Sequence, residues 1–212
     1  MLLAITCGLP MRSTAAEEIV PLIVIDQVPL SDTIKNLVRQ CEFTNVIFDP
    51  RVPGSSFGPG RLLPQPAVSV RLTNISAQAA LREVLKQHKL KMVTNPATTV
   101  TRIAPIATMV EPVRAEEAGS KTNKVVPLLV MDEVPMLDGL NALGKEAGLY
   151  LTFDPKLQAP EFTGQGTLRL RWENITARQA LAALMDNYYL TLTETGPGRA
   201  HIRFKDDVKN AP

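Results

Sequence analysis

The chain has 212 residues, 45% of them hydrophobic and 21% charged, with a formal net charge of +2, which suits one large or two small globular domains. So small a net charge, with 5% aromatic residues and no concentrated stripe of Lys and Arg, excludes a typical nucleic-acid-binding surface. Outside the N-terminus no apolar run approaches the roughly 20 residues of a membrane-spanning helix, so we expect no transmembrane span.

The N-terminus has features of an export signal. Residues 2–9 form a short apolar run, and the small residues 13–16 precede two glutamates. This pattern resembles the second half of a secretory signal peptide cleaved after Ala16, without its basic first segment. A disordered tail at residues 1–18 is the alternative. A lipoprotein signal fits less well, because Ile5 and Thr6 stand before Cys7 where small residues are required.

An internal repeat organises the rest of the chain. An apolar stretch followed by Asp, a polar residue, Val and Pro occurs at residues 21–30 and again at 127–136. The offset between the copies is 106 residues at Asp26 and Asp132 (132 − 26) and falls to 100 at Asn74 and Asn174 (174 − 74). Length changes confined to loops are typical of a duplicated fold. We therefore predict two homologous domains at 19–104 and 125–205, a linker at 105–124 and a tail at 206–212.

Each copy begins with a strand and a helix. The first strand, at residues 22–28, ends at Pro29, and Ser31 is the predicted N-cap of the helix that follows. The apolar face of this helix comprises Ile34, Leu37, Val38 and Cys41 in the first copy and Leu140, Leu143, Gly144 and Ala147 in the second. The face in the second copy has smaller side chains. This predicts either that a neighbouring element approaches the helix more closely or that the helix packs more weakly.

Two further strands follow, separated by a loop. Strands at 46–48 and 150–153 end in Asp-Pro turns at Asp49 and Asp154, because proline excludes the preceding residue from helical geometry. Residues 51–66 are rich in Pro and Gly and predict a surface loop, with a shorter loop at 156–166. The third strands alternate apolar and polar residues, which predicts a half-exposed sheet that is antiparallel on at least one side.

A second helix and a β-hairpin complete each copy. Ser76 and Thr176 are the predicted N-caps, and Thr176 with Gln179 has the spacing of a capping box. Hairpins are predicted at residues 91–103 and 190–204. Each copy is thus predicted to be β-α-β-β-α-β-β. The expected class is α+β, with two helices packed against small antiparallel or mixed sheets.

Residues with catalytic potential are few. His88 and His201 lie in different copies without a shared motif, and Cys41 has no nearby base in the sequence, so structural roles are favoured for all three. Asp26 and Asp132 form the most tempting pair, but their repetition at strand ends before a proline fits turn chemistry better than acid–base catalysis. We therefore predict a protein that is not an enzyme and has no catalytic, cofactor-binding or metal-binding residues.

A partner surface is the more natural expectation. An open sheet edge offers unpaired N–H and C=O groups that a partner strand can complete. Arg169 and Arg171 lie on the polar face of the third strand in the second copy and form the candidate partner surface, the alternative being two merely solvated arginines.

The repeated pattern resembles the short N-terminal domain of secretins and TonB-dependent receptors, in tandem. The resemblance rests on Val-Pro-Leu at 28–30, Phe-Asp-Pro at 48–50 and the Asn-Ile-Ser helix start at 74–76, with their counterparts at 134–136, 153–155 and 174–176. It covers nearly all of residues 19–104 and 125–205, and it comes from apolar spacing and turn residues rather than from a catalytic motif. We expect neither a secretin ring-forming region nor a receptor barrel within these 212 residues, in which they depart from the family.

The resemblance implies an exported module of the periplasm or outer membrane of a Gram-negative-type bacterium. Its implied partners are envelope proteins, such as a secretin or an inner-membrane export component, with self-association as a second mode and no nucleic acid. The alternative function is a module that binds cell-wall glycan or a small ligand in a groove between the copies. Trp172 lies on the apolar side of its strand, which weighs against a glycan site.

Overall fold

The computed structural model describes residues 19–106 and 124–205, which we call the N-terminal and C-terminal halves. The predicted export signal at 1–18, nearly all of the predicted linker and the tail at 206–212 lie outside the described residues. Within the described ranges, no helix combines the length and the apolar character needed to cross a membrane.

The two halves place their elements in a similar order. The N-terminal half comprises β1 (Ile19–Pro29), α1 (Leu30–Gln40), β2 (Val46–Phe48), the 3₁₀ helix η1 (Pro59–Leu62), β3 (Ala67–Ser76), α2 (Ala77–Gln87), β4 (Leu90–Thr94) and β5 (Thr101–Pro105). The C-terminal half comprises β6 (Val125–Pro135), α3 (Met136–Glu146), β7 (Tyr150–Phe153), α4 (Pro155–Gln158), α5 (Pro160–Thr163), β8 (Thr167–Thr176), α6 (Ala177–Asn187), β9 (Leu190–Gly196) and β10 (Arg199–Phe204).

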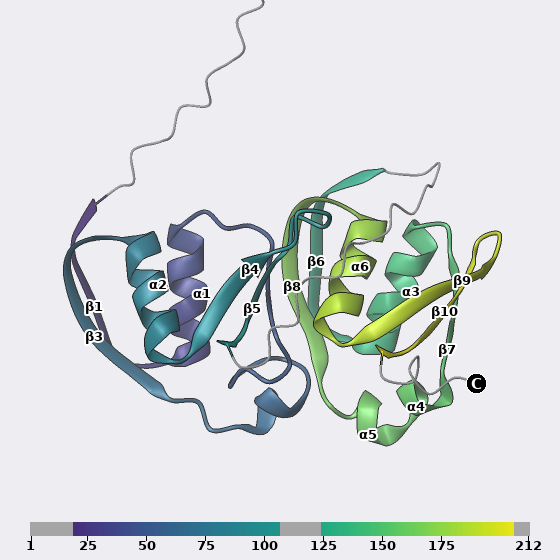
Figure 1. Ribbon diagram of the computed structural model, residues 1–212, viewed down its shortest axis with the longest axis horizontal. Helices are drawn as coiled ribbons and strands as arrows, with labels where there is room; N and C mark the ends of the chain where they lie inside the picture. The colour runs from purple at the N-terminus through teal and green to yellow at the C-terminus, as the bar shows by residue number, and fades with distance from the viewer. Residues whose placement is uncertain (1–18, 107–123, 206–212) are drawn as a thin grey trace, which may run out of the picture.

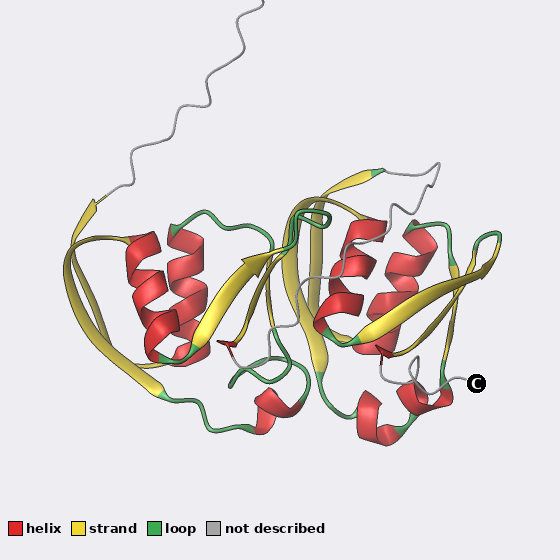
Figure 2. Cartoon of the chain, in the orientation of Figure 1, coloured by secondary structure: helices red, strands yellow, loops and turns green. Residues whose placement is uncertain are grey.

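Small sheets enclose a pair of helices in each half, which confirms the predicted α+β class (Figures 1 and 2). β1 pairs antiparallel with β3, and β6 pairs antiparallel with β8. On the other side of the helices lie three-stranded sheets of order β2-β5-β4 and β7-β10-β9, each with one parallel and one antiparallel pairing. In Figure 1 the three-stranded side of the N-terminal half faces the β6–β8 sheet of the C-terminal half.

Backbone irregularities recur at the same places in the two-stranded sheets. The register shifts between Ile25 and Val28 in β1 and between Met131 and Val134 in β6. Inside these bulges Gln27 and Glu133 adopt left-handed φ values of 53° and 55°. A bulge of this kind bends its strand and increases the local twist, so each first strand curves around its helix pair.

The N-cap prediction at Ser31 is wrong. α1 begins at Leu30 with Pro29 as its N-cap, because Pro29 has φ −53° and the Leu30 amide donates to the Pro66 carbonyl at 3.0 Å. Ser31 is buried and donates instead to Gln65 at 2.8 Å. The caps predicted for the second helices are confirmed: Ser76 accepts from the Ala79 amide, and the capping box at Thr176 forms in full.

The two predicted loops are partly buried, contrary to expectation. In residues 51–66, Val52 and Phe57 are inaccessible to solvent, and η1 occupies part of the segment. In residues 156–166, α4 and α5 bury Leu157 and Phe162. Proline and glycine form the turns of both segments, but the larger apolar side chains of these segments reach the core. Burying one such side chain stabilises the fold by about 1.5–3 kcal/mol.

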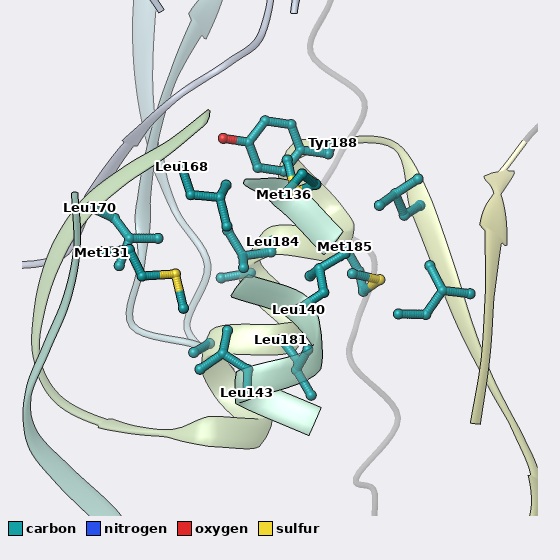
Figure 3. Packing of buried hydrophobic residues seen from close by; sticks show 14 of the residues in the cluster. Met131, Met136, Leu140, Leu143, Leu168, Leu170, Leu181, Leu184, Met185 and Tyr188 are labelled. Carbon is teal, nitrogen blue, oxygen red and sulfur yellow. The ribbon is translucent and has the colours of Figure 1, made fainter. Parts of the chain in front are cut away.

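The slim face of α3 has a close neighbour, as one of the two alternatives predicted. A Cβ on Gly144 would lie 2.6 Å from the Leu151 side chain, and a Cβ on Gly139 would lie 2.6 Å from Leu168. Because Gly139 and Gly144 have no side chains, β7 and β8 can approach α3 at these two positions. Figure 3 shows part of the resulting core, where residues of α3 and α6 meet Leu168 and Leu170.

Candidate functional site

The N-terminal half covers the free edge of β8 in the C-terminal half. Asn45, which precedes β2 and is 8% exposed, uses its side-chain amide as a strand would use its backbone. Its Nδ2 donates to the Glu173 carbonyl at 3.1 Å, and its Oδ1 accepts from the Glu173 amide at 2.7 Å. Pairing of an open strand edge satisfies backbone groups that would otherwise need water.

Side chains of the C-terminal half in turn satisfy carbonyls of β2. The indole N–H of Trp172, whose ring is fully buried, donates to the Val46 carbonyl at 3.2 Å. Asn187, at the end of α6, donates to the Phe48 carbonyl at 3.0 Å. We call this contact of β2 and its neighbouring loops with β8 and the end of α6 the junction. Each half donates hydrogen bonds to the other across it.

A buried ionic cluster lies at the end of β2. The Asp49 side chain is completely buried and accepts from Arg51 Nε at 2.9 Å, Arg51 Nη2 at 2.9 Å and Arg102 Nη2 at 2.6 Å. The hydroxyl of Tyr189 from the C-terminal half donates to Asp49 at 2.9 Å and accepts from both arginines. Removing one partner from a buried pair of this kind is strongly destabilising.

The Tyr189 ring also lies beneath both guanidinium groups. The Cζ atoms of Arg51 and Arg102 lie 4.8 and 4.9 Å from the ring centroid, within the range of cation–π attraction. Tyr189 reaches this position from a left-handed backbone conformation, with φ 57°. Arg102 extends the cluster by donating to the Asp186 carbonyl at 3.3 Å, and the Asp186 carboxylate pairs with Lys205 at 3.0 Å.

Aromatic packing joins the halves beside this cluster. The Phe57 ring meets Phe162 at 5.2 Å and Tyr188 at 5.1 Å, both edge-on. Ile47 and Val100 of the N-terminal half belong to the same apolar cluster, so the core of the C-terminal half extends across the junction. Burial raises the pKa of the Tyr188 hydroxyl well above its usual range, and the nearby Asp49 carboxylate adds to this effect.

A groove of about 970 Å³ opens alongside the junction. α1 contributes Lys35 and Arg39 to one wall, and the outer face of the β6–β8 sheet forms the other, with Val130 among its residues. Both predicted surface residues, Arg169 and Arg171, line this groove and are 55% and 66% exposed.

The two groove arginines have acidic neighbours. Arg169 binds Glu133 and lies 3.8 Å from Asp132, while Arg171 lies 3.9 Å from Glu173. Exposed pairs of this kind contribute little stability, so both guanidinium groups can exchange partners.

The first strand of each half exposes apolar side chains at equivalent positions. On β1 these are Leu22 and Val24, exposed by 43% and 59%. On β6 they are Leu128 and Val130, exposed by 44% and 54%. Adjacent apolar side chains on an open sheet face are typical of interaction surfaces.

The other residues singled out in the sequence lie apart from the junction's polar contacts. Asp26 accepts from Ser69 at 3.1 Å, and Asp154 caps α4 by accepting from the Lys156 amide at 2.9 Å. His201 shares a hydrogen bond with Thr152, and His88 is the half-buried C-cap of α2. Cys41 is half-buried at the end of α1. In the described ranges, no three His, Cys, Asp or Glu side chains are grouped to hold a metal ion.

Sequence reasoning missed the residues that build the junction. Asp49 was expected to serve only its turn, and Asn45, Arg102 and Tyr189 were not singled out. A signal was present in the differences between the copies rather than in their matches. Asn45 is matched by Tyr150, and Tyr189 is matched by Lys89, whereas Asp49 is matched by another aspartate, Asp154. The copies therefore differ chemically at two of the positions that build the junction.

No protein-family model, no curated protein and no solved structure matches the chain.

Proposed function

We propose that this chain is a non-enzymatic protein-interaction or assembly module of the bacterial envelope, made of two homologous β-α-β-β-α-β-β domains at 19–104 and 125–205. The matched strand orders and the bulges at Gln27 and Glu133 support a duplication. The proposed relationship to the short N-terminal domains of secretins and TonB-dependent receptors rests on the sequence pattern described above.

The observation that carries this proposal is the pairing of Asn45 with the β8 edge at Glu173. Within one chain, a domain of this type presents a strand edge and a second domain completes it. Partner proteins that add to a sheet edge use the same backbone groups. The chain thus contains an example of the association that we propose for its partners.

The ionisable groups of the junction support a structural role for that surface. The Asp49 carboxylate is completely buried, and its oxygens accept hydrogen bonds from two guanidinium groups and a phenol. A general base needs a free path to a substrate proton. The strongest electrostatic feature of the junction is therefore best suited to holding the halves together.

Partner recovery tests the proposed function. The full-length protein, displayed on a resin, is incubated with envelope extract, and the wild type is compared with Arg169→Glu/Arg171→Glu. We expect a defined envelope protein, such as a secretin or an inner-membrane export component, to be retained. Unchanged recovery by the double variant would exclude the arginine face, and no specific recovery would contradict the interaction function. Cell fractionation of the native protein tests the proposed periplasmic or outer-membrane location.

The groove favours a second candidate function, the binding of a glycan or a small ligand. Its volume of about 970 Å³ and its mixed lining of Arg169, Arg171 and Val130 are compatible with a polar ligand. The Trp172 ring is buried in the core and is not available for stacking on a sugar. Direct binding to cell-wall glycan fragments, abolished by Arg169→Glu/Arg171→Glu, would favour this function over protein interaction.

A further inference from the structure

The far end of the N-terminal half repeats the surface that is covered at the junction. In β8 the inward-facing Leu170, Trp172 and Ile175 are 7%, 0% and 0% exposed, and they belong to the core that extends across the junction. Their equivalents in β3 are Val70, Leu72 and Ile75, and all three are only half-buried. β3 pairs with β1 along one edge. Among the described residues no strand pairs with its other edge.

Backbone geometry makes the two surfaces directly comparable. Thr73 pairs with Leu22 across β1, and Glu173 pairs with Leu128 across β6, so the two strands have the same register. The Glu173 amide donates away from β6 to Asn45. The same register directs the Thr73 amide away from β1, toward the uncovered side.

The two surfaces differ in charge at the end of the second helix. At the junction, the Asp186 carboxylate lies 3.9 Å from Arg102, and Tyr189 donates to the Asp49 carboxylate. The equivalent residues of the N-terminal half are both exposed lysines, Lys86 and Lys89. The backbone of Lys89 has φ 54°, close to the 57° of Tyr189, so the two side chains leave the fold in the same direction.

We propose that the outer face of the N-terminal half, defined by Leu72, Thr73, Lys86 and Lys89, docks an acidic partner protein through a strand edge. The partner completes the edge at Thr73 as Asn45 completes it at Glu173. It places carboxylates on Lys89, where the junction has Asp49 on Tyr189, and on Lys86, where the junction has Arg102 on Asp186. This inference rests on the proposed interaction function and adds the location and charge of the partner surface.

A second copy of this chain fits the outer face poorly. The surface of the C-terminal half that corresponds to the covering surface of the N-terminal half carries Tyr150 in place of Asn45 and Lys156 in place of Arg51. Arg199 and His201 stand there in place of Val100 and Arg102. Asp154 keeps a carboxylate in the place of Asp49 but caps α4, and Tyr150 lacks the side-chain amide with which Asn45 completes the edge at Glu173. The loss of the edge-pairing amide therefore favours a different protein over a second copy, and the exposed Lys86 and Lys89 favour an acidic one.

Defined peptides test the proposal on the full-length chain. The acidic probe has the sequence of residues 43–51 with Arg51 replaced by Glu. The basic probe has the same sequence with both Asp49 and Arg51 replaced by Lys. Binding is followed by NMR titration of the isotopically labelled protein. We expect the acidic probe to shift the amide signals of Thr73, Lys86 and Lys89, and to bind about tenfold more tightly than the basic probe at low salt.

Charge reversal supplies the controls. Lys86→Glu/Lys89→Glu is expected to invert the preference between the probes, whereas Lys124→Glu/Lys145→Glu, which changes the net charge equally on exposed residues of the C-terminal half, is expected to preserve it. Binding that is absent, or equally sensitive to both double variants, would overturn the proposal. Concentration-dependent dimers lost in Lys86→Glu/Lys89→Glu would overturn it in favour of a second copy. Partner recovery from extract without peptide binding would leave the interaction function standing and reject this surface.

Discussion

Asp49→Asn is the most informative perturbation of the junction. The substitution preserves the shape of the side chain but removes the charge that offsets Arg51 and Arg102. The Asp49 carboxylate accepts hydrogen bonds from Arg51, Arg102 and Tyr189 at 2.6–2.9 Å and is inaccessible to solvent. Loss of one partner from a buried ion pair costs about 3–5 kcal/mol. Because the Arg51 side chain is 35% exposed and can regain water, we expect the lower end, about 3 kcal/mol.

Trp172 provides the assay. It is the only tryptophan of the chain, it is fully buried, and its indole N–H donates to the Val46 carbonyl across the junction. Its fluorescence during urea unfolding therefore reports the docking of the halves as well as the core. We expect Asp49→Asn to lower the free energy of unfolding by about 3 kcal/mol, or to produce an earlier transition in which the halves separate.

The equivalent residue of the other half is the matched control. Asp154 is half-buried, and its side chain caps α4 rather than joining an ionic cluster. Asparagine caps helices about as well as aspartate does, so Asp154→Asn is expected to cost only a few tenths of a kcal/mol. Equal effects of the two substitutions would refute the assignment of Asp49 to a cluster that joins the halves.

Three further predictions follow from single contacts. Asn45→Ala removes both bonds to Glu173 and should destabilise the protein by about 1–3 kcal/mol, measured by the same urea unfolding. Thr176→Ala breaks the capping box of α6 and should cost about 1 kcal/mol in thermal unfolding, whereas an unchanged midpoint would contradict the cap. Because burial raises the pKa of Tyr188, its stabilising neutral form is fully present below the unfolded pKa of about 10, and stability falls above that pH by up to about 1.4 kcal/mol per pH unit. Tyr188→Phe should make that alkaline decline shallower, and an identical decline in both proteins would argue against a buried phenol.

Local rules predicted most of the elements because each element's own residues determine it. The alternation of Leu168, Leu170 and Trp172 with Arg169 and Arg171 identifies β8 and its buried face without reference to the rest of the chain. The caps at Ser76 and Thr176 are equally local. The error at Ser31 arose because the Leu30 amide finds a partner at Pro66, which is distant in sequence.

The junction was beyond prediction because it depends on contacts between residues 84 to 140 positions apart. An Asp-Pro turn looks the same whether its carboxylate faces water, as Asp154 partly does, or lies beneath Tyr189. Burial of Phe57 likewise required Phe162 and Tyr188 from the other half. The prediction of Arg169 and Arg171 as a surface needed only the strand alternation, but their position in a groove required the placement of α1.

Amide hydrogen exchange at two equivalent positions tests the central claim most directly. The Glu173 amide donates to Asn45 across the junction, whereas Thr73, at the same register position in β3, faces the uncovered side. The account predicts slow exchange at Glu173, fast exchange at Thr73, and loss of the difference in Asn45→Ala. Equally fast exchange at both amides in the wild-type protein would show that the N-terminal half does not complete the β8 edge, and would contradict the account.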